Sequence, residues 1–166
     1  MATMDNLKDA FAGESQANRK YTAFAKKAEA DGFPQVAKLF RAAAAAETVH
    51  ALEHFRVMGG IKTTKDNLQA AIEGEGFEFQ QMYPKFVSTA KEENNQDAFY
   101  SFDNAMKVEE IHHELYSEAL KAVANGKDMA SDDIYVCRHC GNTVIGAAPS
   151  RCPICGKPED YFDEIA

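Results

Sequence analysis

Acidic residues and histidines lie in the middle of four segments whose apolar residues otherwise repeat as on one face of an amphipathic helix. The apolar positions recur every three or four residues, and the carboxylates fall on the same face. Two of the segments add a histidine three residues after a glutamate. Burying unpaired carboxylates is costly, so a core of this composition requires cations. The side chains on these faces are Glu14, Glu47, His50, Glu75, Glu78, Glu109 and His112.

Two metal ions at the centre of a four-helix bundle would explain this pattern. Their positive charges would offset five glutamates, and two imidazoles would complete the coordination shells. Carboxylate-rich ligation favours iron or manganese over a structural zinc. Bundles of this kind take one Glu from each of two helices and one Glu-x-x-His from each of the other two. The third segment has one carboxylate more than this scheme needs, because Glu75 and Glu78 share its inward face.

Caps and helix breakers divide the first part of the chain into four expected helices. Asp5 has the chemistry of an N-cap for the first helix, and Asp66 or Thr64 that of a cap for the third. Pro84 lies inside the third helix, where we expect a kink. The expected ranges are 6–30, 34–58, 66–93 and 96–124.

The helical part is predicted to be an internal duplication of one helical hairpin. Its first portion recurs 61 residues later, as Glu14 recurs at Glu75 (75 − 14), and its remainder recurs 62 residues later, as His50 recurs at His112 (112 − 50). Aromatic positions repeat as well. The matched aromatic residues are Tyr21 and Tyr83, Phe24 and Phe86, and Phe40 and Phe102.

The change of offset places one additional residue between Glu75 and Tyr83, in the stretch that contains the unmatched Glu78. A residue added inside a helix is commonly absorbed as a π-bulge, and such bulges occur often at functional sites. We therefore expect a π-bulge within residues 76–83.

The connection between the two hairpins is short for the distance that it has to cover. If all ligands lie at the same height along the bundle axis, the chain must travel roughly 29 Å along that axis between the end of the second helix and the start of the third. Residues 59–66 reach at most about 26 to 29 Å when fully stretched. One solution is a homodimer in which two chains exchange hairpins. The other is a closed monomer with a taut linker and one frayed helix end.

Charge and cysteine distribution limit the partners and the compartment. The net charge of −8 argues against nucleic acid and anionic membrane surfaces as partners. The first residues lack the basic start and apolar core of a secretory signal, and no apolar run approaches membrane-spanning length. All four cysteines lie in two tight pairs near the end of the chain, which is typical of a metal site in a reducing cytoplasm.

The composition changes after the fourth helix, so we divide the chain into a helical domain (1–130) and a cysteine module (131–166). Two Cys-x-x-Cys knuckles separated by eleven residues predict a tetrahedral site with four sulfur ligands. Zinc and iron both suit this geometry. The four ligands are Cys137, Cys140, Cys152 and Cys155.

The surroundings of the knuckles favour iron. Tyr135 before the first knuckle, the Cys-Pro-x-Cys-Gly sequence of the second, and Tyr161-Phe162 after it resemble the rubredoxin pattern, whose single iron carries one electron. A one-electron iron site also suits a neighbouring pair of irons that needs a reductant. His139 is expected to be a solvent-facing spacer, since four sulfurs already satisfy the metal.

The whole chain resembles the rubrerythrins, which join a ferritin-like di-iron four-helix bundle to a rubredoxin-like domain. The resemblance extends over essentially the full length. It rests on the segment 11–17, Glu47-x-x-His50, Gly74-Glu-x-x-Glu78 with Met82-Tyr-Pro84, Glu109-x-x-His112 and the two knuckles.

The resemblance implies a peroxidase that reduces hydrogen peroxide to water in oxidative stress defence. It implies that all seven carboxylate and histidine positions named above bind a di-iron centre, with Glu47 and Glu109 bridging. One iron would move with redox state between His50 and Glu78, and Tyr21 and Tyr83 would line the site. Electrons would come from rubredoxin or an NAD(P)H-dependent reductase through the four-cysteine iron, which by family pattern serves the bundle of the dimer partner.

Two other functions fit parts of the sequence. A ferritin-like ferroxidase would use the same bundle with oxygen, but it would need no dedicated electron carrier. A zinc-structured helical module for protein contacts would leave the buried glutamates unexplained. Among the remaining residues, His54 is expected either to support the ligands without binding metal or simply to be a hydrogen-bonded histidine of the helix face. His113 and Glu110 are expected to face outward.

Overall fold

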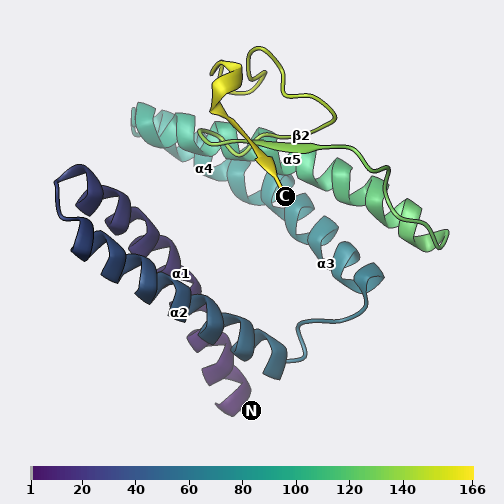
Figure 1. Cartoon of the computed structure of the whole chain (residues 1–166). Helices are drawn as coiled ribbons and strands as arrows, with labels where there is room; N and C mark the ends of the chain where they lie inside the picture. Colours follow the sequence, from purple (N-terminus) through teal and green to yellow (C-terminus); the bar gives the residue numbers. More distant parts are fainter. Residues whose placement is uncertain (1) are drawn as a thin grey trace. The chain divides into compact units, whose positions relative to one another are not determined.

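The computed structural model describes residues 2–166. The chain forms two compact units that meet between Lys62 and Thr63, and each is described by itself. The first is a helical hairpin, and the second combines a longer helical hairpin with a small antiparallel sheet (Figure 1). In the part of the chain that is described, no helix combines the length and the hydropathy needed to cross a membrane.

The first unit consists of α1 (Ala2–Ala30) and α2 (Pro34–Val57). α1 begins earlier than the sequence predicts, so the assignment of Asp5 as N-cap is wrong. Asp5 lies instead in the first helical turn, where its charge favours the positive end of the helix dipole. Gly32, with φ 81°, allows the tight turn between the helices. Pro34 begins α2, as expected.

Alanines form the contact between α1 and α2 and let the two backbones approach closely. The buried polar exception is Asn18, whose amide donates to the carbonyl of Ala44 at 2.6 Å and to the hydroxyl of Thr48 at 2.7 Å. This satisfied amide ties the two helices together near the middle of the hairpin. The buried alanines are Ala25, Ala28, Ala37, Ala44 and Ala51.

The long helix of the second unit has three parts: α3 (Thr64–Phe77), a π-helical turn η1 (Glu78–Met82) and α4 (Tyr83–Glu92). η1 confirms the predicted bulge. The N–H of Tyr83 donates to the carbonyl of Glu78, five residues earlier, instead of four as in an α-helix. Pro84 follows in the first turn of α4, where a missing N–H is tolerated.

α5 (Gln96–Ala124) packs antiparallel to this long helix and has the predicted range. Asn95 caps α5 by accepting the N–H of Ala98 at 3.1 Å. The cap of α3 differs from the prediction of Asp66 or Thr64: the hydroxyl of Thr63 accepts the N–H of Asp66 at 3.2 Å. Thr63 has extended backbone angles, as an N-cap requires, whereas Thr64 is already helical.

The cysteine module forms a three-stranded antiparallel sheet in the order β2-β1-β3. The strands are β1 (Ile134–Cys137), β2 (Thr143–Ile145) and β3 (Phe162–Ile165), and a 3-10 turn η2 (Glu159–Tyr161) precedes β3. Tyr135 pairs with Val144 on one side of β1 and with Glu164 on the other. The sheet aligns the two knuckles at one end.

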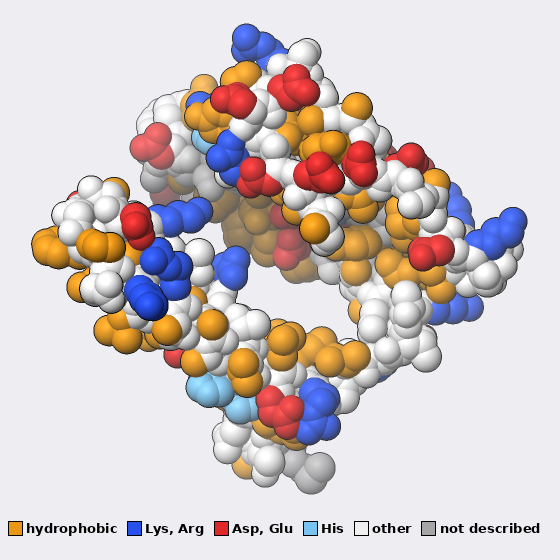
Figure 2. Space-filling view, in the orientation of Figure 1, with side chains coloured by type: hydrophobic (Ala, Val, Ile, Leu, Met, Phe, Trp, Pro, Cys, Tyr) orange, Lys and Arg blue, Asp and Glu red, His pale blue; other side chains and the backbone are white. Residues whose placement is uncertain are grey.

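Large apolar side chains are only partly covered in both units. Among residues 2–166 the buried apolar residues are alanines, Val87, Val108 and two cysteines, while no Leu, Ile, Met, Phe or Tyr is buried. Orange apolar side chains are accordingly visible over the surface in Figure 2. Exposed apolar surface of this extent is typical of association sites. Examples on α2 are Leu39, Val49 and Leu52.

Candidate metal centres

The first unit brings together Glu14 of α1 with Glu47 and His50 of α2. One donor atom from each residue lies within 4.8 Å of the others. Nδ1 of His50 is 3.1 Å from Oε2 of Glu47, so this nitrogen faces the carboxylates. The His50 side chain is 55 % exposed. The group is therefore an open half-site on one face of the hairpin.

Glu14 and Glu47 lie close enough to shift each other's pKa. Their mutual hydrogen bond raises the pKa of Glu14 and lowers that of Glu47. Desolvation and the charge of Glu47 raise the pKa of Glu14 further, while His50 and His54 act in the opposite direction. A divalent cation bound between the two carboxylates would stabilise both in the charged form.

The second unit repeats this arrangement with Glu75 of α3 and with Glu109 and His112 of α5. Their donor atoms also lie within 4.8 Å of one another. Nδ1 of His112 is 2.9 Å from Oε2 of Glu109 and 3.9 Å from Oε1 of Glu75. Desolvation, followed by repulsion from Glu109, raises the pKa of Glu75. A cation bound between Glu75 and Glu109 would offset this repulsion and stabilise both carboxylates in the charged form.

Glu78 stands apart from this group of three but interacts with it. It lies in η1, and desolvation followed by the charge of Glu75 raises its pKa. Glu75 and Glu78 are three residues apart at the end of α3 and therefore share one helix face. The π turn begins at Glu78 and turns the residues that follow, including Tyr83, by about 100° relative to these two carboxylates.

An aromatic cluster flanks each half-site with nearly the same spacing. The ring centroid of Tyr21 lies 6.3 Å from that of Phe24 and 6.1 Å from that of Phe40. The ring centroid of Tyr83 lies 6.0 Å from that of Phe86 and 6.3 Å from that of Phe102. Desolvation, then the charges of Glu109, Glu78 and Glu75, raises the pKa of Tyr83. This tyrosine therefore faces the second half-site. The equal spacing in the two clusters agrees with the predicted duplication.

Three further residues are placed as predicted and one is not. His54 is close enough to Glu14 to affect its pKa, while Glu110 and His139 are exposed. The expectation that His113 faces outward is wrong, because its ring contacts Phe79 of η1 at 5.4 Å in a T-shaped arrangement. The extra residue of η1 turns Phe79 toward α5, which explains the contact.

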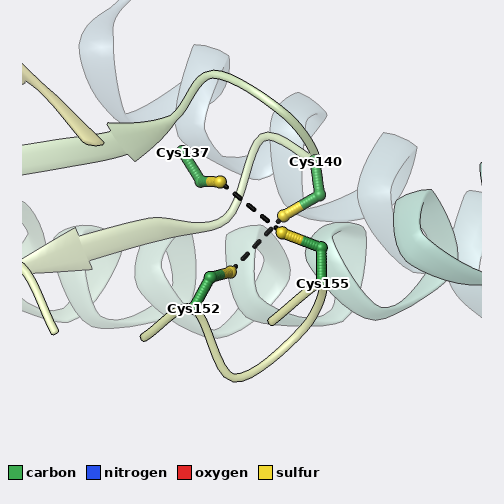
Figure 3. A group of neighbouring side chains, drawn as sticks. All are labelled: Cys137, Cys140, Cys152 and Cys155. Atoms are coloured by element: carbon green, nitrogen blue, oxygen red, sulfur yellow. Dashed lines mark hydrogen bonds between the residues drawn. The ribbon is translucent and has the colours of Figure 1, made fainter. Parts of the chain in front are cut away.

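The four cysteines point to a common centre (Figure 3). Sγ of Cys137 lies 3.7 Å from Sγ of Cys155, and Sγ of Cys140 lies 3.6 Å from Sγ of Cys152. Metal–sulfur bonds of about 2.3 Å in a tetrahedron require sulfur separations of about 3.8 Å. All four cysteines are free of disulfides. The group therefore fits one tetrahedral metal ion.

The protonation of the cysteines also favours a bound cation. Desolvation raises the pKa of the Cys140 and Cys155 thiols. Desolvation acts in the same direction on Cys152, but hydrogen bonds from the backbone N–H groups of Cys155 and Ile154, together with those of the Cys155 and Cys140 thiols, outweigh it and lower the pKa of this thiol. Four neighbouring thiolates are stable together only around a metal ion.

The cysteine module contacts the second half-site of its own chain. Nε2 of His112 lies 2.9 Å from the hydroxyl of Thr143, the first residue of β2. A β-carbon built on Gly141 would come within 3.7 Å of Val108 of α5, so the first knuckle lies close over this helix. No local sequence pattern indicates this contact, since the hydrogen-bonded residues are 31 positions apart.

Two family models match the chain. The model described as Rubrerythrin matches residues 5–120, and the model described as Rubrerythrin, rubredoxin-like domain, matches residues 135–163. Together they extend over the helical part and the cysteine module.

Several relatives match nearly the full chain. Nigerythrin of Nitratidesulfovibrio vulgaris is 40% identical, over 97% of this chain and 85% of nigerythrin. Rubrerythrin of Porphyromonas gingivalis is 35% identical, over 98% of this chain and 90% of the relative. Rubrerythrin-2 of Clostridium acetobutylicum is 34% identical, over 96% and 95%.

Solved structures of nigerythrin are also similar. The partially reduced state gives a TM-score of 0.59 at 35% identity and covers 98% of this chain and 86% of nigerythrin. The fully reduced, all-ferrous state gives a TM-score of 0.59 at 34% identity with the same coverage. The family models and the relatives thus match both the helical part and the cysteine module of this chain. The chain belongs to the rubrerythrin family, with a ferritin-like helical domain for a di-iron site and a rubredoxin-like domain for a four-cysteine iron site.

Proposed function

We propose that this protein is a non-haem di-iron peroxidase that reduces hydrogen peroxide to water with electrons delivered through its four-cysteine iron. The observation that carries the proposal is the presence of two matching Glu, Glu, His half-sites and a tetrahedral sulfur site in one chain. A storage protein has no use for the sulfur site. The proposed di-iron ligands are Glu14, Glu47, His50, Glu75, Glu78, Glu109 and His112.

The half-sites form a working centre only when a first-unit hairpin and a second-unit hairpin face each other. Each half-site offers three donors, and two metal ions with open positions for peroxide need more than three. The exposed apolar side chains of both units supply the surface that such a pairing would bury. We therefore place the centre between two hairpins, in the bundle topology of the family.

The linker favours hairpins from two different chains. α2 ends ten residues after Glu47 (57 − 47), and α3 begins eleven residues before Glu75 (75 − 64). In a ferritin-like bundle the connection between the second and third helices returns along the length of the bundle. It must therefore cover both of these helical segments, about 31 Å in total at about 1.5 Å per residue. The connection 58–63 reaches at most about 25 Å. A homodimer with exchanged hairpins removes this shortfall, whereas a closed chain would have to unwind helix ends.

Bound iron would supply the Lewis acidity and the two electrons that cleavage of the peroxide O–O bond requires. The protein would supply proton control. Desolvation and Glu75 raise the pKa of the Glu78 carboxyl, which makes Glu78 a candidate proton donor in the state in which His50 and not Glu78 binds the iron. The raised pKa of Tyr83 keeps its hydroxyl protonated and able to donate a hydrogen bond. Tyr21 has the matching place beside the first half-site.

Two electrons and two protons convert one hydrogen peroxide to two waters, while the four-cysteine iron carries one electron at a time. We propose rubredoxin or an NAD(P)H-dependent reductase as the electron donor. Zinc in the sulfur site would preserve the fold of the module but stop this delivery. Four free cysteines suit a reducing cytoplasm.

Stopped-flow oxidation of the fully reduced iron-loaded protein tests the proposal. We expect hydrogen peroxide to oxidise the centre much faster than dissolved oxygen at equal concentration. The four-cysteine iron, followed by its visible absorption, should be oxidised after the di-iron centre. Equal rates with oxygen would instead assign the protein to the ferroxidases. A protein reconstituted with zinc in the sulfur site serves as control and should stop after one turnover.

A further inference from the structure

We infer that a groove between α5 and the cysteine module is the docking site for the protein that reduces the four-cysteine iron, and that this donor presents a Lys or Arg side chain on an apolar segment. This docking site rests on the proposed function, which requires an electron donor from outside the chain. It adds the surface that the donor contacts and the charge that the donor carries.

The groove has apolar walls and an acidic rim. It lies within the second unit and encloses about 640 Å³. Three exposed carboxylates form the rim: Glu118 of α5, and Asp128 and Asp132 of the segment between α5 and β1. None of the described residues that line the groove is a Lys, Arg or His. An apolar segment that carries a cation therefore complements both the walls and the rim. The apolar lining residues include Ile111, Leu115, Met129, Val144, Ile145 and Pro153.

A buried amide at the wall of the groove has no partner. Asn142 is 1 % exposed, and its Nδ2 is the one buried side-chain nitrogen or oxygen in residues 2–166 without a hydrogen bond. Leaving a buried amide N–H unpaired is costly, and such groups in folded proteins are rare. Rotation of this amide toward the groove would let a backbone carbonyl of the docked segment accept its N–H. The groove thus offers a donor for a backbone and carboxylates for a cationic side chain.

The same wall is part of the sulfur site. The carbonyl of Asn142 accepts the N–H of Cys137 at 2.9 Å, and the backbone N–H of Asn142 donates to the thiol of Cys140. Pro153, which also lines the groove, lies inside the second knuckle. A docked segment would therefore lie against both knuckles. One electron would pass from the donor, which is oxidised, to the ferric four-cysteine iron, which becomes ferrous, and no covalent bond is made or broken.

The charge distribution of the chain favours a cationic donor. The second unit has nine basic and nineteen acidic side chains (9 − 19 = −10), whereas the first has nine basic and seven acidic ones (9 − 7 = +2). Two cations near the knuckles are already engaged: Arg138 pairs with Asp163 at 3.2 Å, and Nζ of Lys157 lies 5.1 Å from the ring centroid of Tyr161. An acidic surface of this kind speeds the approach of a cationic partner.

Pairing of the hairpins leaves the groove open. The proposed ligands Glu109 and His112 share one face of α5, where the second hairpin would lie. Ile111 and Glu118 of the groove lie about 140° away from that face, at about 100° per residue. The donor and the paired hairpin would therefore contact different faces of the same helix.

The first test measures reduction of the ferric four-cysteine iron by two small probes, the cation hexaammineruthenium(II) and the anion dithionite. Stopped-flow bleaching of the visible absorption gives the rate constants at low and at high salt. The groove variant combines Glu118→Gln, Asp128→Asn and Asp132→Asn. The control variant removes the same charge at exposed positions outside the groove, by Glu73→Gln, Glu92→Gln and Glu93→Gln.

We expect the cation to reduce the groove variant about tenfold more slowly than wild type at low salt, because the local attraction is lost. High salt should remove most of this difference. Dithionite should reduce the groove variant at least as fast as wild type, and the control variant should stay near the wild-type rate with both probes. Equal slowing of both variants by the cation, or no slowing of the groove variant, would overturn the docking site.

The second test detects a cationic peptide in the groove. The full chain is loaded with diamagnetic zinc, and the side-chain amide signals of isotopically labelled protein are followed by NMR while hexalysine is added. Asn142→Leu, which lacks one pair of signals, assigns the Asn142 amide. We expect a saturable shift of this amide with hexalysine and no shift with hexaglutamate. An Asn142 amide that hexalysine does not shift would overturn its part in docking.

Neither test uses peroxide. A protein that fails as a peroxidase would still show the charge-selective reduction and the amide shift if the groove is a docking site. A working peroxidase without these two effects would take its electrons at another surface.

Discussion

The backbone N–H of Tyr83 donates to the carbonyl of Glu78, five residues earlier, and this single wider turn distinguishes the second hairpin from the first in an otherwise repeated structure. The first hairpin has no equivalent turn and no equivalent of Glu78. The second half-site thus has, at the start of its π turn, a nearby carboxylate that the first half-site lacks. Asymmetry of this kind is what a centre needs if its two metal ions have different roles.

Deletion of Gln80 should convert η1 to regular α-helix and make the second hairpin similar to the first. We expect the fold to survive, because α1 already has the uninterrupted geometry. Residues from Tyr83 onward would turn by about 100° relative to Glu75 and Glu78, so the Tyr83 hydroxyl and the Glu78 carboxyl would no longer share one face. Peroxide oxidation of the ferrous protein should therefore slow by at least tenfold, in the range of general acid catalysis. Stopped-flow absorption and circular dichroism measure the two effects. Gln80→Ala is the control, and a deletion variant with wild-type oxidation rate would contradict the role of the π turn.

The metal-free protein should become less stable as the pH rises toward neutrality. The folded-state pKa values of Glu75 and Glu78 are raised above the ordinary value of 4.5. Their contribution to stability is thus fully present below pH 4.5 and is lost as the pH rises through the higher folded-state values. Glu78→Gln should flatten this dependence and raise the melting temperature at pH 7. Thermal unfolding of chelator-treated protein across the pH range measures it. An unchanged pH profile in Glu78→Gln would contradict the prediction.

Removal of the metals should lower the melting temperature at neutral pH. Ions that bind only the folded state stabilise it by about 2.7 kcal/mol at 100 times their Kd. Calorimetry of stripped and iron-reloaded protein measures this difference. Glu47→Gln with Glu109→Gln should remove most of it, because one proposed ligand of each half-site then lacks its charge. Equal melting temperatures of stripped and iron-loaded protein would contradict the prediction. They would show that the clustered carboxylates do not destabilise the fold in the absence of cations.

A longer linker should change the oligomeric state. Insertion of six Gly and Ser residues after Gly60 adds roughly 20 Å of reach, which lets the two hairpins of one chain face each other. We expect the wild type to be a dimer and the insertion variant to be largely monomeric with both metal sites intact. Light scattering at micromolar concentration and iron analysis measure these properties. Ile61→Ser tests separately whether the exposed apolar side chain of the linker, and not the length of the linker, maintains the dimer. A monomeric wild type would end the exchange hypothesis.

Periodic features were well predicted from sequence, and contacts between distant elements were not. The range of α5 follows from its apolar spacing and its Asn95 cap, and η1 follows from the unequal repeat offset. The beginning of α1 was missed because Asp5 has cap chemistry, although a helix accepts the same residue in its first turn. The contact of His113 with Phe79 and the hydrogen bond of His112 to Thr143 depend on how separate elements pack, which local spacing does not encode.

The alanine contact between α1 and α2 has a consequence for how the protein accumulates in a cell. The apolar side chains that this hairpin buries fully are alanines, and its aromatic rings are only partly covered, so the hairpin gains limited free energy from its own contacts and depends on a second hairpin and on charge neutralisation for its stability. Subunit association, iron uptake and completion of folding would then advance together. The amount of intact protein would follow the iron supply. When iron is scarce, the chain would be degraded and would not accumulate as metal-free protein.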